Sequence, residues 1–308
     1  MDFLDAAALR TRLPWPALIE ALRQAFVQGC EVPLRHTHAI GDAGTSLIMP
    51  AWRPGGRFGV KTVNIFPGNS ARGLPGLHGI YTLFDATTGV PLAVLDGSEL
   101  TARRTAAASA LAADYLARPD ATRLLVVGAG RVGALLPGAM QAVRPGLRQV
   151  QVWNRTPAAA RALVDDLTRE GFDATVCSDL QAGVHAAHIV SCATLSTAPL
   201  IDGDWLQPGS HLDLIGSFKP DQRESDGRCW AHSRVFVDTE EALAKSGDAL
   251  GAIAKGQFQP QQLQATLAAL CRGTHAGRGA ADEITLFKSV GSALEDLAAA
   301  ELACGQAS

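Results

Sequence analysis

One segment near the middle of the chain restricts the fold more than any other. An apolar run, Leu124–Val127, leads directly into GAGRVG at 128–133, and helical periodicity follows. A GxGxxG pattern between a strand and a helix is typical of the first turn of a doubly wound parallel sheet. The first glycine permits the tight turn, the second leaves room for a phosphate, and the third lets the helix pack on the strand. The pattern predicts a dinucleotide site contacted by Gly128, Gly130, Arg131, Val132 and Gly133.

The sequence around this turn alternates between strand and helix patterns. Apolar segments that predict strands lie at 123–127, 149–154, 174–178, 188–194, 211–217 and 234–238. Helical patterns lie at 131–143, where Pro137 interrupts the run, and at 158–171, where glycine ends it. This rhythm predicts a Rossmann domain over residues 119–283, with an α/β fold.

The rest of the chain has a different texture. Residues 1–30 have helical spacing, and short apolar segments separated by glycine and proline fill 32–96, as in the hairpins of an antiparallel sheet. An alanine-rich helix is expected over 98–117, and a long apolar-patterned helix from Ile284. We therefore expect residues 1–118 and 284–308 to form a second, α+β domain with an antiparallel sheet.

The end of the second Rossmann strand bears on the choice between NAD(H) and NADP(H). An acidic residue there usually accepts a hydrogen bond from the ribose 2′-hydroxyl of NAD. This chain has Asn154, Arg155 and Thr156 instead. Arginine can pair with a 2′-phosphate, and the two neighbours can donate hydrogen bonds to it. The pattern favours NADP(H), with NAD(H) as the alternative.

Charge and hydropathy exclude several other classes of function. The formal net charge of −3 provides no excess of basic residues for binding nucleic acid. The sequence contains no run of about 18 apolar residues, so no membrane span is predicted. The first residues lack the pattern of a secretion signal, so a cytoplasmic location is expected. His185 and His188 lie three apart without a carboxylate or thiolate at ligand spacing, so no metal site is predicted.

Nine stretches together resemble the ornithine cyclodeaminase and mu-crystallin family. They cover most of the chain in order, and LTARRTAA and LFKSVGSALED are the most specific of them. The stretches lie at 33–38, 48–50, 58–69, 74–89, 95–107, 126–130, 152–156, 215–224 and 284–296. The resemblance implies a substrate and dimerisation domain, an inserted Rossmann domain, and a homodimer formed through the antiparallel sheets.

The resemblance also implies roles for individual residues. Arg35 matches the arginine that grips the substrate carboxylate, Lys61 the active-site lysine, and Arg104 a second arginine near substrate and cofactor. Because Arg103 and Arg104 are neighbours on a helix, the sequence does not decide which of them faces the pocket. His78 could hydrogen-bond substrate or be structural. The cofactor contacts implied outside the glycine turn are those of Thr105, Thr194, Leu195, Lys288 and Val290, with Ser289 in the same motif.

One departure from the family pattern selects among its chemistries. Where cyclodeaminases have Gly-Gly-Asp-x-Pro, with the aspartate as acid/base, this chain has Phe218 two residues before Pro220. Phenylalanine cannot transfer a proton, and general acid–base catalysis contributes roughly 10²–10⁴-fold. The resemblance is therefore to the branch of NAD(P)H-dependent oxidoreductases that reduce cyclic ketimines.

The predicted reaction is reduction of Δ1-pyrroline-2-carboxylate to L-proline, and also of Δ1-piperideine-2-carboxylate to L-pipecolate. Lys61, helped by Ser217, is the candidate for proton transfer. Three alternatives stay open: an alanine dehydrogenase-like reductive amination, an ornithine cyclodeaminase, and a non-catalytic mu-crystallin-like protein that binds NADPH or another ligand.

Overall fold

The computed structural model of the chain describes residues 1–305 and divides into two compact units. Unit 1 comprises Met1–Arg104 and Ser292–Ser308, and unit 2 comprises Thr105–Gly291. These boundaries differ from the predicted 118/119 and 283/284. The first boundary in the structure, after Arg104, falls inside helix α3 (Gly97–Leu116). The second, after Gly291, lies later than predicted because residues 285–288 pair into the sheet of unit 2.

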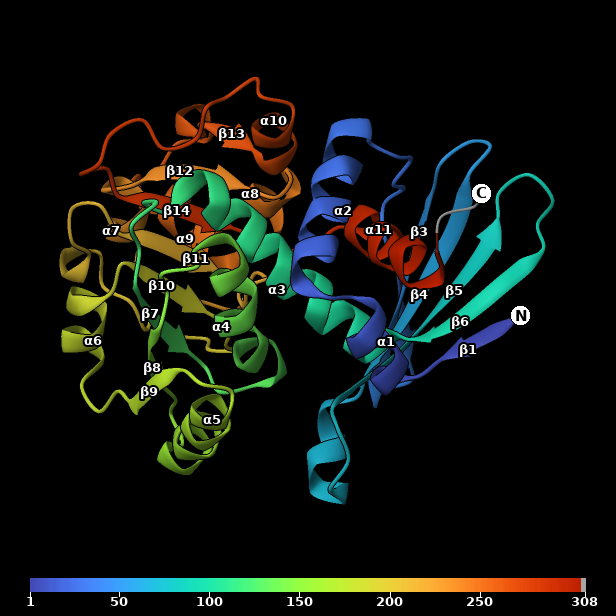
Figure 1. Cartoon of the computed structure of the whole chain (residues 1–308), viewed down its shortest axis with the longest axis horizontal. Helices are drawn as coiled ribbons and strands as arrows, with labels where there is room; N and C mark the ends of the chain where they lie inside the picture. The colour runs from blue at the N-terminus through green and yellow to red at the C-terminus, as the bar shows by residue number, and fades with distance from the viewer. Residues whose placement is uncertain (306–308) are drawn as a thin grey trace. The chain divides into compact units, whose positions relative to one another are not determined.

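Unit 1 contains a six-stranded sheet in the order β1-β6-β5-β4-β3-β2 (Figure 1). Strands β2 to β6 pair antiparallel, as predicted, but β1 pairs with β6 in parallel, so the sheet is mixed. The strands are β1 (Asp2–Leu4), β2 (His36–Ile40), β3 (Gly44–Trp52), β4 (Arg57–Ile65), β5 (Leu77–Asp85) and β6 (Pro91–Asp96). The helices wholly within this unit are α1 (Ala6–Arg12), α2 (Trp15–Gln28), the 3-10 turn η1 (Pro67–Arg72) and α11 (Ala293–Cys304).

The two faces of this sheet differ in burial. Along β4, Gly59, Lys61 and Val63 are buried, whereas the residues between them are half-buried or exposed. Successive side chains of a strand point to opposite faces, so Lys61 belongs to the buried face. Helix α11 packs on α2 and on β3 and β4, as the red and blue helices of Figure 1 show. The lysine is therefore buried in the core of unit 1.

Unit 2 contains an eight-stranded sheet in which every pairing is parallel, in the order β13-β12-β14-β11-β10-β7-β8-β9 (Figure 1). The chain moves from β7 outward to β8 and β9 and then returns to β10 on the other side of β7. This reversal is the topological switch point of a Rossmann sheet, which confirms the predicted fold class. The strands are β7 (Arg123–Val127), β8 (Gln149–Trp153), β9 (Asp173–Val176), β10 (Ile189–Cys192), β11 (His211–Leu214), β12 (Arg234–Val237), β13 (Ala265–Thr266) and β14 (Thr285–Lys288).

Helices lie in the connections between these strands, because parallel strands must be joined by crossover connections. They are α4 (Arg131–Val143), α5 (Pro157–Arg169), α6 (Leu180–Ala186), η2 (Gly203–Trp205), α7 (Gly227–Ala231), α8 (Glu241–Lys245), α9 (Gly247–Ala254), η3 (Pro260–Gln262) and α10 (Leu267–Cys271). Helix α4 continues through Pro137. Among residues 1–305, no helix combines the length and the apolar character needed to cross a membrane.

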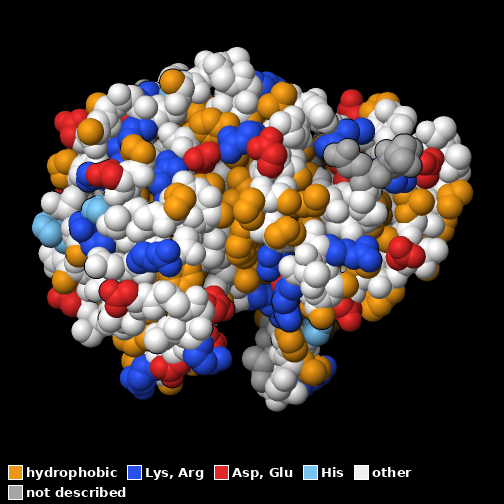
Figure 2. All heavy atoms as spheres, viewed as in Figure 1, with side chains coloured by type: hydrophobic (Ala, Val, Ile, Leu, Met, Phe, Trp, Pro, Cys, Tyr) orange, Lys and Arg blue, Asp and Glu red, His pale blue; other side chains and the backbone are white. Residues whose placement is uncertain are grey.

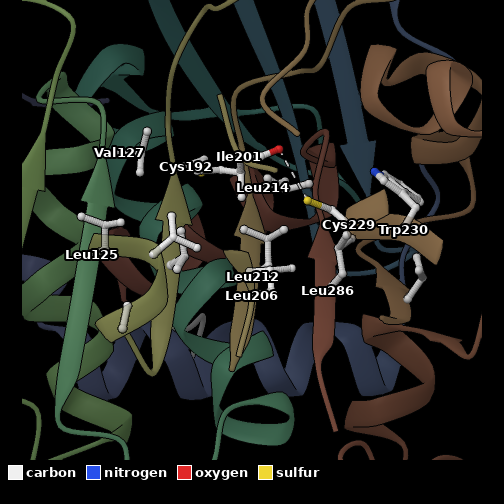
Figure 3. Packing of buried hydrophobic residues seen from close by; sticks show 14 of the residues in the cluster. Leu125, Val127, Cys192, Ile201, Leu206, Leu212, Leu214, Cys229, Trp230 and Leu286 are labelled. Carbon is white, nitrogen blue, oxygen red and sulfur yellow. Dashed lines mark hydrogen bonds between the residues drawn. The ribbon is translucent and has the colours of Figure 1, made fainter. Parts of the chain in front are cut away.

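One hydrophobic cluster of unit 2 lies against one face of the parallel sheet. Figure 3 shows Leu125, Cys192, Leu212 and Leu286 pointing the same way from four neighbouring strands, and Trp230 beside them. Truncating one such leucine to alanine costs about 2–5 kcal/mol, because the cavity left behind collapses only in part. On the face drawn in Figure 2, acidic and basic side chains are interspersed, in keeping with the small net charge.

The predicted helix from Ile284 is wrong over its first residues. Thr285–Lys288 forms the fully buried strand β14, between β11 and β12, and the helix begins only at Ala293. A short apolar run has the same pattern in a buried strand as in a buried helix, so periodicity alone does not separate them.

Candidate functional site

The glycine turn after β7 has the geometry that its sequence predicts. Gly128 has a φ of 108°, a conformation that side chains other than glycine rarely adopt. A Cβ atom on Gly133 would lie 1.9 Å from the carbonyl oxygen of Gly128, whereas one on Gly130 would meet nothing within 4 Å. Gly130 is the N-cap of α4 and makes no side-chain capping bond. The open space and the uncapped helix N-terminus fit the pyrophosphate of a dinucleotide.

Asn154 lies at the carboxyl end of β8 and braces this turn. Its Oδ1 accepts a hydrogen bond from the backbone N–H of Ala129 at 3.1 Å, and its Nδ2 donates to the carbonyl oxygen of Thr156 at 3.1 Å. Arg155, Thr156 and Arg131 are exposed. Asn154 therefore holds the glycine turn, while Arg155, after β8, and Arg131, at the start of α4, are exposed to solvent.

A buried glutamate joins the segments that follow β10 and β11. Glu224 accepts hydrogen bonds from Thr194, through the backbone N–H at 2.6 Å and the hydroxyl at 2.8 Å, and from the N–H of Gly216 at 2.7 Å. Burial raises the pKa of Glu224 to about 7, opposed by Lys288. Leu195, next to Thr194, is 70% exposed. Sequence reasoning proposed Thr194 and Leu195 but missed Glu224, whose only signal was its place in a family stretch.

Lys288 and Val290 lie beside buried carboxylates. The Nζ atom of Lys288 is 3.7 Å from Oδ2 of Asp248, and both side chains are fully buried. The backbone N–H groups of Val290 and Gly291 donate to Asp238 at 2.8 and 2.7 Å. In this structure the charge of Lys288 therefore faces protein carboxylates, and its predicted contact with the cofactor stays a prediction.

Ser217 is not placed as a free catalytic hydroxyl. Its Oγ donates to the carbonyl oxygen of Gln222 at 2.7 Å and accepts from the N–H of Asp248 at 3.1 Å. The side chain is fully buried. Both interactions lie within the protein, so Ser217 braces this loop in the structure, and its predicted catalytic role stays a prediction.

The strongest cluster of charges in unit 1 joins Lys61 and Arg104 through two acids of α11. The Nζ atom of Lys61 is 2.6 Å from Oδ2 of Asp296. Arg104 contacts Oδ1 of Asp296 through Nε at 2.9 Å and Oε2 of Glu295 through Nη1 at 2.5 Å. We call these four residues the lysine–arginine cluster. All four are buried, so the two positive charges are balanced by two negative charges away from water.

The two cations of this cluster differ in the direction in which their pKa values are shifted. Burial lowers the pKa of Lys61 to about 8, with a further lowering by Arg104, against the opposing effect of Asp296. Burial also lowers the pKa of Arg104, but Asp296 and Glu295 more than reverse this and leave it raised. Lys61 is therefore the cation that can release a proton near neutral pH, while Arg104 stays charged.

The structure decides which of the two adjacent arginines of α3 belongs to the cluster. Arg103 donates to the carbonyl oxygen of Leu13 at 2.6 and 3.2 Å and stacks on the Trp15 ring, with its guanidinium carbon 4.2 Å from the ring centroid. Arg104 turns to Asp296 instead. Asp296 and Glu295 were not predicted as site residues. Acids in the first turn of a helix are common because they interact favourably with the helix dipole, so their presence alone does not indicate a site.

Three other predicted residues lie at different places along the chain's elements. His78 pairs with Asn64 across β4 and β5 and lies three positions from Tyr81, the partner of Lys61, so it is on the opposite face of the sheet. Arg35 precedes β2 and is half-buried, and Thr105 follows Arg104 on α3. His78 and Lys61 therefore point to opposite faces of the sheet within one chain, and a contact of His78 with substrate stays a prediction. The roles of Arg35 and Thr105 stay predictions.

The two histidines that were weighed as a metal pair have protein partners. His185 Nδ1 lies 2.8 Å from the amide nitrogen of Gln207, and His188 Nδ1 accepts from the N–H of Thr122 at 3.0 Å. Within residues 1–305, no group of three or more His, Cys, Asp or Glu side chains is placed to hold a metal ion.

The fold defines a two-unit α/β protein with a Rossmann-type sheet. Unit 1 contains the lysine–arginine cluster, and unit 2 contains the glycine turn and the buried Glu224. Residues 8–308 match the ornithine cyclodeaminase/mu-crystallin family. A Δ1-pyrroline-2-carboxylate reductase of Paracoccus denitrificans is 40% identical over 297 residues, which cover 96% of this chain and 94% of that protein. The chain belongs to the ornithine cyclodeaminase/mu-crystallin family, as its sequence predicted.

Solved structures of similar proteins agree with this assignment. The Δ1-pyrroline-2-carboxylate reductase of Thermococcus litoralis, in complex with NADH and L-proline, superposes with a TM-score of 0.93 at 31% identity, covering 99% of this chain and 96% of that one. An archaeal alanine dehydrogenase dimer with bound NAD has a TM-score of 0.91 at 27% identity, covering 99% and 95%.

Proposed function

We propose that this chain reduces Δ1-pyrroline-2-carboxylate to L-proline with NADPH, and Δ1-piperideine-2-carboxylate to L-pipecolate by the same steps. The observation that carries the proposal is the buried, ion-paired Lys61, in a chain that is similar over nearly its full length to reductases of this substrate. A cyclic α-imino acid has a carboxylate to bind and an imine nitrogen to protonate. The charged side chains of unit 1 suit both tasks.

The substrate carboxylate would be bound by Arg35 and Arg104. The guanidinium of Arg104 has one donor bound to Asp296 and another to Glu295, so its remaining nitrogen, Nη2, is the one left to contact a ligand. A forked contact, which uses two parallel N–H groups, is proposed for Arg35, because two of the three guanidinium nitrogens of Arg104 already bond to carboxylates.

Lys61 would supply the proton. When bound, NADPH supplies the hydride, which adds to the imine carbon while the nitrogen gains a proton. An ammonium with a pKa of about 8 is mostly charged at neutral pH and releases its proton more readily than an ordinary lysine. Asp296 would fix the position of that ammonium. Proton transfer by a positioned group contributes roughly 10²–10⁴-fold to the rate.

The preference for NADPH over NADH rests on the end of β8. Residues 154–156 contain no acid, Arg155 follows β8, Arg131 is the first residue of α4, and both arginines are exposed. Two guanidinium groups there suit a 2′-phosphate. Arg155→Gln should weaken NADPH binding by about 10-fold, the size of one charge-assisted hydrogen bond, and leave NADH binding unchanged. Equal losses for both nucleotides would contradict this assignment.

The chain is also proposed to form a homodimer through the sheet of unit 1. Leu34, Ile40 and Ile80 lie on or beside this sheet and are 73%, 47% and 52% exposed. Exposed apolar side chains on one face of a sheet are typical of an interface. Ile80→Asp should convert the dimer to a monomer in analytical ultracentrifugation, and an unchanged mass would remove this face from the interface.

Reductive amination of pyruvate is the second candidate, supported by the structural similarity to an alanine dehydrogenase. Ornithine cyclodeamination is disfavoured by Phe218. A purely binding, mu-crystallin-like role is disfavoured by the lysine–arginine cluster, because four buried ionised groups are costly to desolvate and a binding protein has no evident use for a titratable lysine.

One set of parallel assays separates these functions. Purified protein is mixed with NADPH and Δ1-pyrroline-2-carboxylate, and nicotinamide absorbance and L-proline are measured. NADH, pyruvate with ammonia, and ornithine with NAD⁺ are run alongside. Imine-dependent NADPH loss with L-proline formation is the expected result. Ammonia-dependent turnover of pyruvate, or ammonia released from ornithine, would replace the proposal, and nucleotide binding without any turnover would favour the binding role.

A further inference from the structure

Glu224 connects two segments that are far apart in the sequence of unit 2. Its Oε1 accepts two hydrogen bonds from Thr194, after β10, and its Oε2 accepts one from Gly216, after β11. The side chain is fully buried. A carboxylate that accepts three hydrogen bonds through both oxygens holds its partners in one geometry more firmly than a neutral acceptor would.

The two segments are in direct contact where Glu224 joins them. A Cβ atom on Gly216 would lie 1.8 Å from the carbonyl oxygen of Thr194 and 2.5 Å from Oε1 of Glu224. Only glycine lets the backbones approach this closely. Glu224 is itself held, because its own N–H donates to Oδ1 of Asp248 at 2.8 Å.

The charged and titratable groups around Glu224 come from three elements. Lys288 on β14 lowers the pKa of Glu224, and Asp248 on α9 raises it. Cys192, at the end of β10, has a thiol whose pKa is raised well above its usual value by burial and by Glu224. The ammonium of Lys288 is therefore the cation that stabilises the ionised form of Glu224.

The contact that Glu224 makes between Thr194 and Gly216 lies in the second half of the Rossmann sheet. A dinucleotide binds outside the carboxyl ends of the strands, with one mononucleotide on each βαβαβ half. The glycine turn follows β7, in the first half, and Thr194 and Gly216 follow β10 and β11, in the second. A Cβ atom on Gly128 would lie 2.7 Å from the carbonyl oxygen of Ala193, so the Thr194 segment adjoins the glycine turn.

We propose that Glu224 is a positioning residue for the nicotinamide end of the cofactor, and that it acts by holding the Thr194 segment against Gly216. Glu224 is buried beneath these segments, so it acts through them. The proposal rests on the part of the proposed function that assigns a nicotinamide dinucleotide to unit 2. It does not depend on the imino acid substrate.

The proposal predicts that nicotinamide contact depends on pH. Protonation of Glu224 turns one of its acceptor oxygens into a donor, which then opposes an N–H group of Thr194 or Gly216. The pKa of Glu224 is raised to about 7, so the ionised form is present above that pH and lost below it. Affinity that comes from the nicotinamide ring should therefore decrease as pH falls from 8 to 6.

Binding measurements with two nucleotides test the proposal without using activity. Isothermal titration calorimetry compares NADPH with 2′-phospho-ADP-ribose, which lacks only the nicotinamide ring, in the wild-type protein and in Glu224→Gln. The amide keeps one acceptor but places an NH₂ group against a backbone donor. NADPH affinity should fall about 10-fold, and affinity for 2′-phospho-ADP-ribose should change less than 2-fold. NADH and ADP-ribose provide the same comparison if the 2′-phosphate is not used.

Asp213→Asn is the matched control, because Asp213 is a buried carboxylate of the same sheet that accepts from the hydroxyls of Ser109 and Ser191. It should leave both affinities unchanged. Equal losses for both nucleotides in Glu224→Gln, or no loss for either, would overturn the proposal.

If Glu224→Gln does not fold, the wild-type protein decides alone. The ratio of NADPH affinity to 2′-phospho-ADP-ribose affinity should fall between pH 8 and 6, and a constant ratio would overturn the proposal. Failure of the proposed function is distinguishable, since it would appear as nucleotide binding without imine turnover.

Discussion

The two units bury charged side chains in different ways. In the lysine–arginine cluster of unit 1, cations and acids meet directly, at 2.5 to 2.9 Å. In unit 2, Lys288 is 3.7 Å from Asp248, and the carboxylates of Glu224 and Asp248 are satisfied mainly by backbone N–H groups.

The difference follows from what each cluster holds. Ion pairs between side chains fix the position and protonation of those side chains, which suits a unit proposed to bind and protonate a substrate. Carboxylates bound to N–H groups fix the backbone, which suits a unit whose loops are proposed to receive a cofactor. Loss of one charge should accordingly be more costly in unit 1 than in unit 2.

The largest effect is expected for Lys61→Met, which keeps the volume and removes the titratable amine. Turnover should fall by about 10²–10⁴-fold, with NADPH affinity unchanged. In the wild-type protein, turnover should decrease as pH rises above about 8, because Lys61 then loses the proton it donates. Steady-state kinetics across pH 6–10 measure both effects. Full activity of the variant would remove Lys61 from the mechanism.

Asp296→Asn should destabilise the protein most. It leaves Lys61 without its carboxylate and Arg104 with only Glu295, and breaking a buried ion pair costs about 3–5 kcal/mol. Urea unfolding measures the loss. The matched control is Asp166→Asn, which breaks the exposed pair with Arg169 and should have no measurable effect. A loss of unfolding free energy no larger than that of the control would show that the ion pairs of Asp296 do not stabilise the protein.

Asp248→Asn is the corresponding change in unit 2 and should cost less, about 1–2 kcal/mol. An asparagine oxygen can still accept from the N–H groups of Glu224 and Ser225, which lie 2.8 and 2.9 Å from Oδ1 of Asp248. Glu224 remains as a negative charge for Lys288. If this variant lost as much unfolding free energy as Asp296→Asn, the contrast between the two units would be wrong.

The smallest effect is expected for Ser217→Ala. The loss of a buried hydroxyl leaves the carbonyl of Gln222 and the N–H of Asp248 without this partner, at a cost of about 1 kcal/mol. Turnover should stay within about 3-fold of the wild-type value, because the hydroxyl braces the loop, and in this respect it differs from Lys61. A loss of 100-fold in turnover at unchanged stability would instead support the catalytic role that the sequence predicted for Ser217.

Local patterns predicted local features well. The turn at 128–133 requires the backbone freedom of glycine, and the alternation of strand and helix patterns indicated the parallel sheet. The stretches that resemble the family led to the correct family. The segment that was misjudged, Thr285–Lys288, is a strand because it pairs with β11 and β12, whose residues are distant in the sequence. The hydrogen bond of Ser217 with Asp248 and the sheet face of His78 likewise depend on residues outside the local pattern.

The sequence by itself therefore determined the Rossmann fold and the glycine turn, because these follow from backbone freedom and periodicity, and its resemblance to the family indicated the candidate cations Lys61 and Arg104. Only the tertiary structure decided that Asp296 joins those cations and that Glu224 joins Thr194 to Gly216. Asp296 is separated from Lys61 by more than 230 residues in the sequence, and the hydrogen bonds of Glu224 span up to 30 residues. Pairings over such distances are selected by packing and by the need to satisfy each buried charge, and neither leaves a local pattern in the sequence.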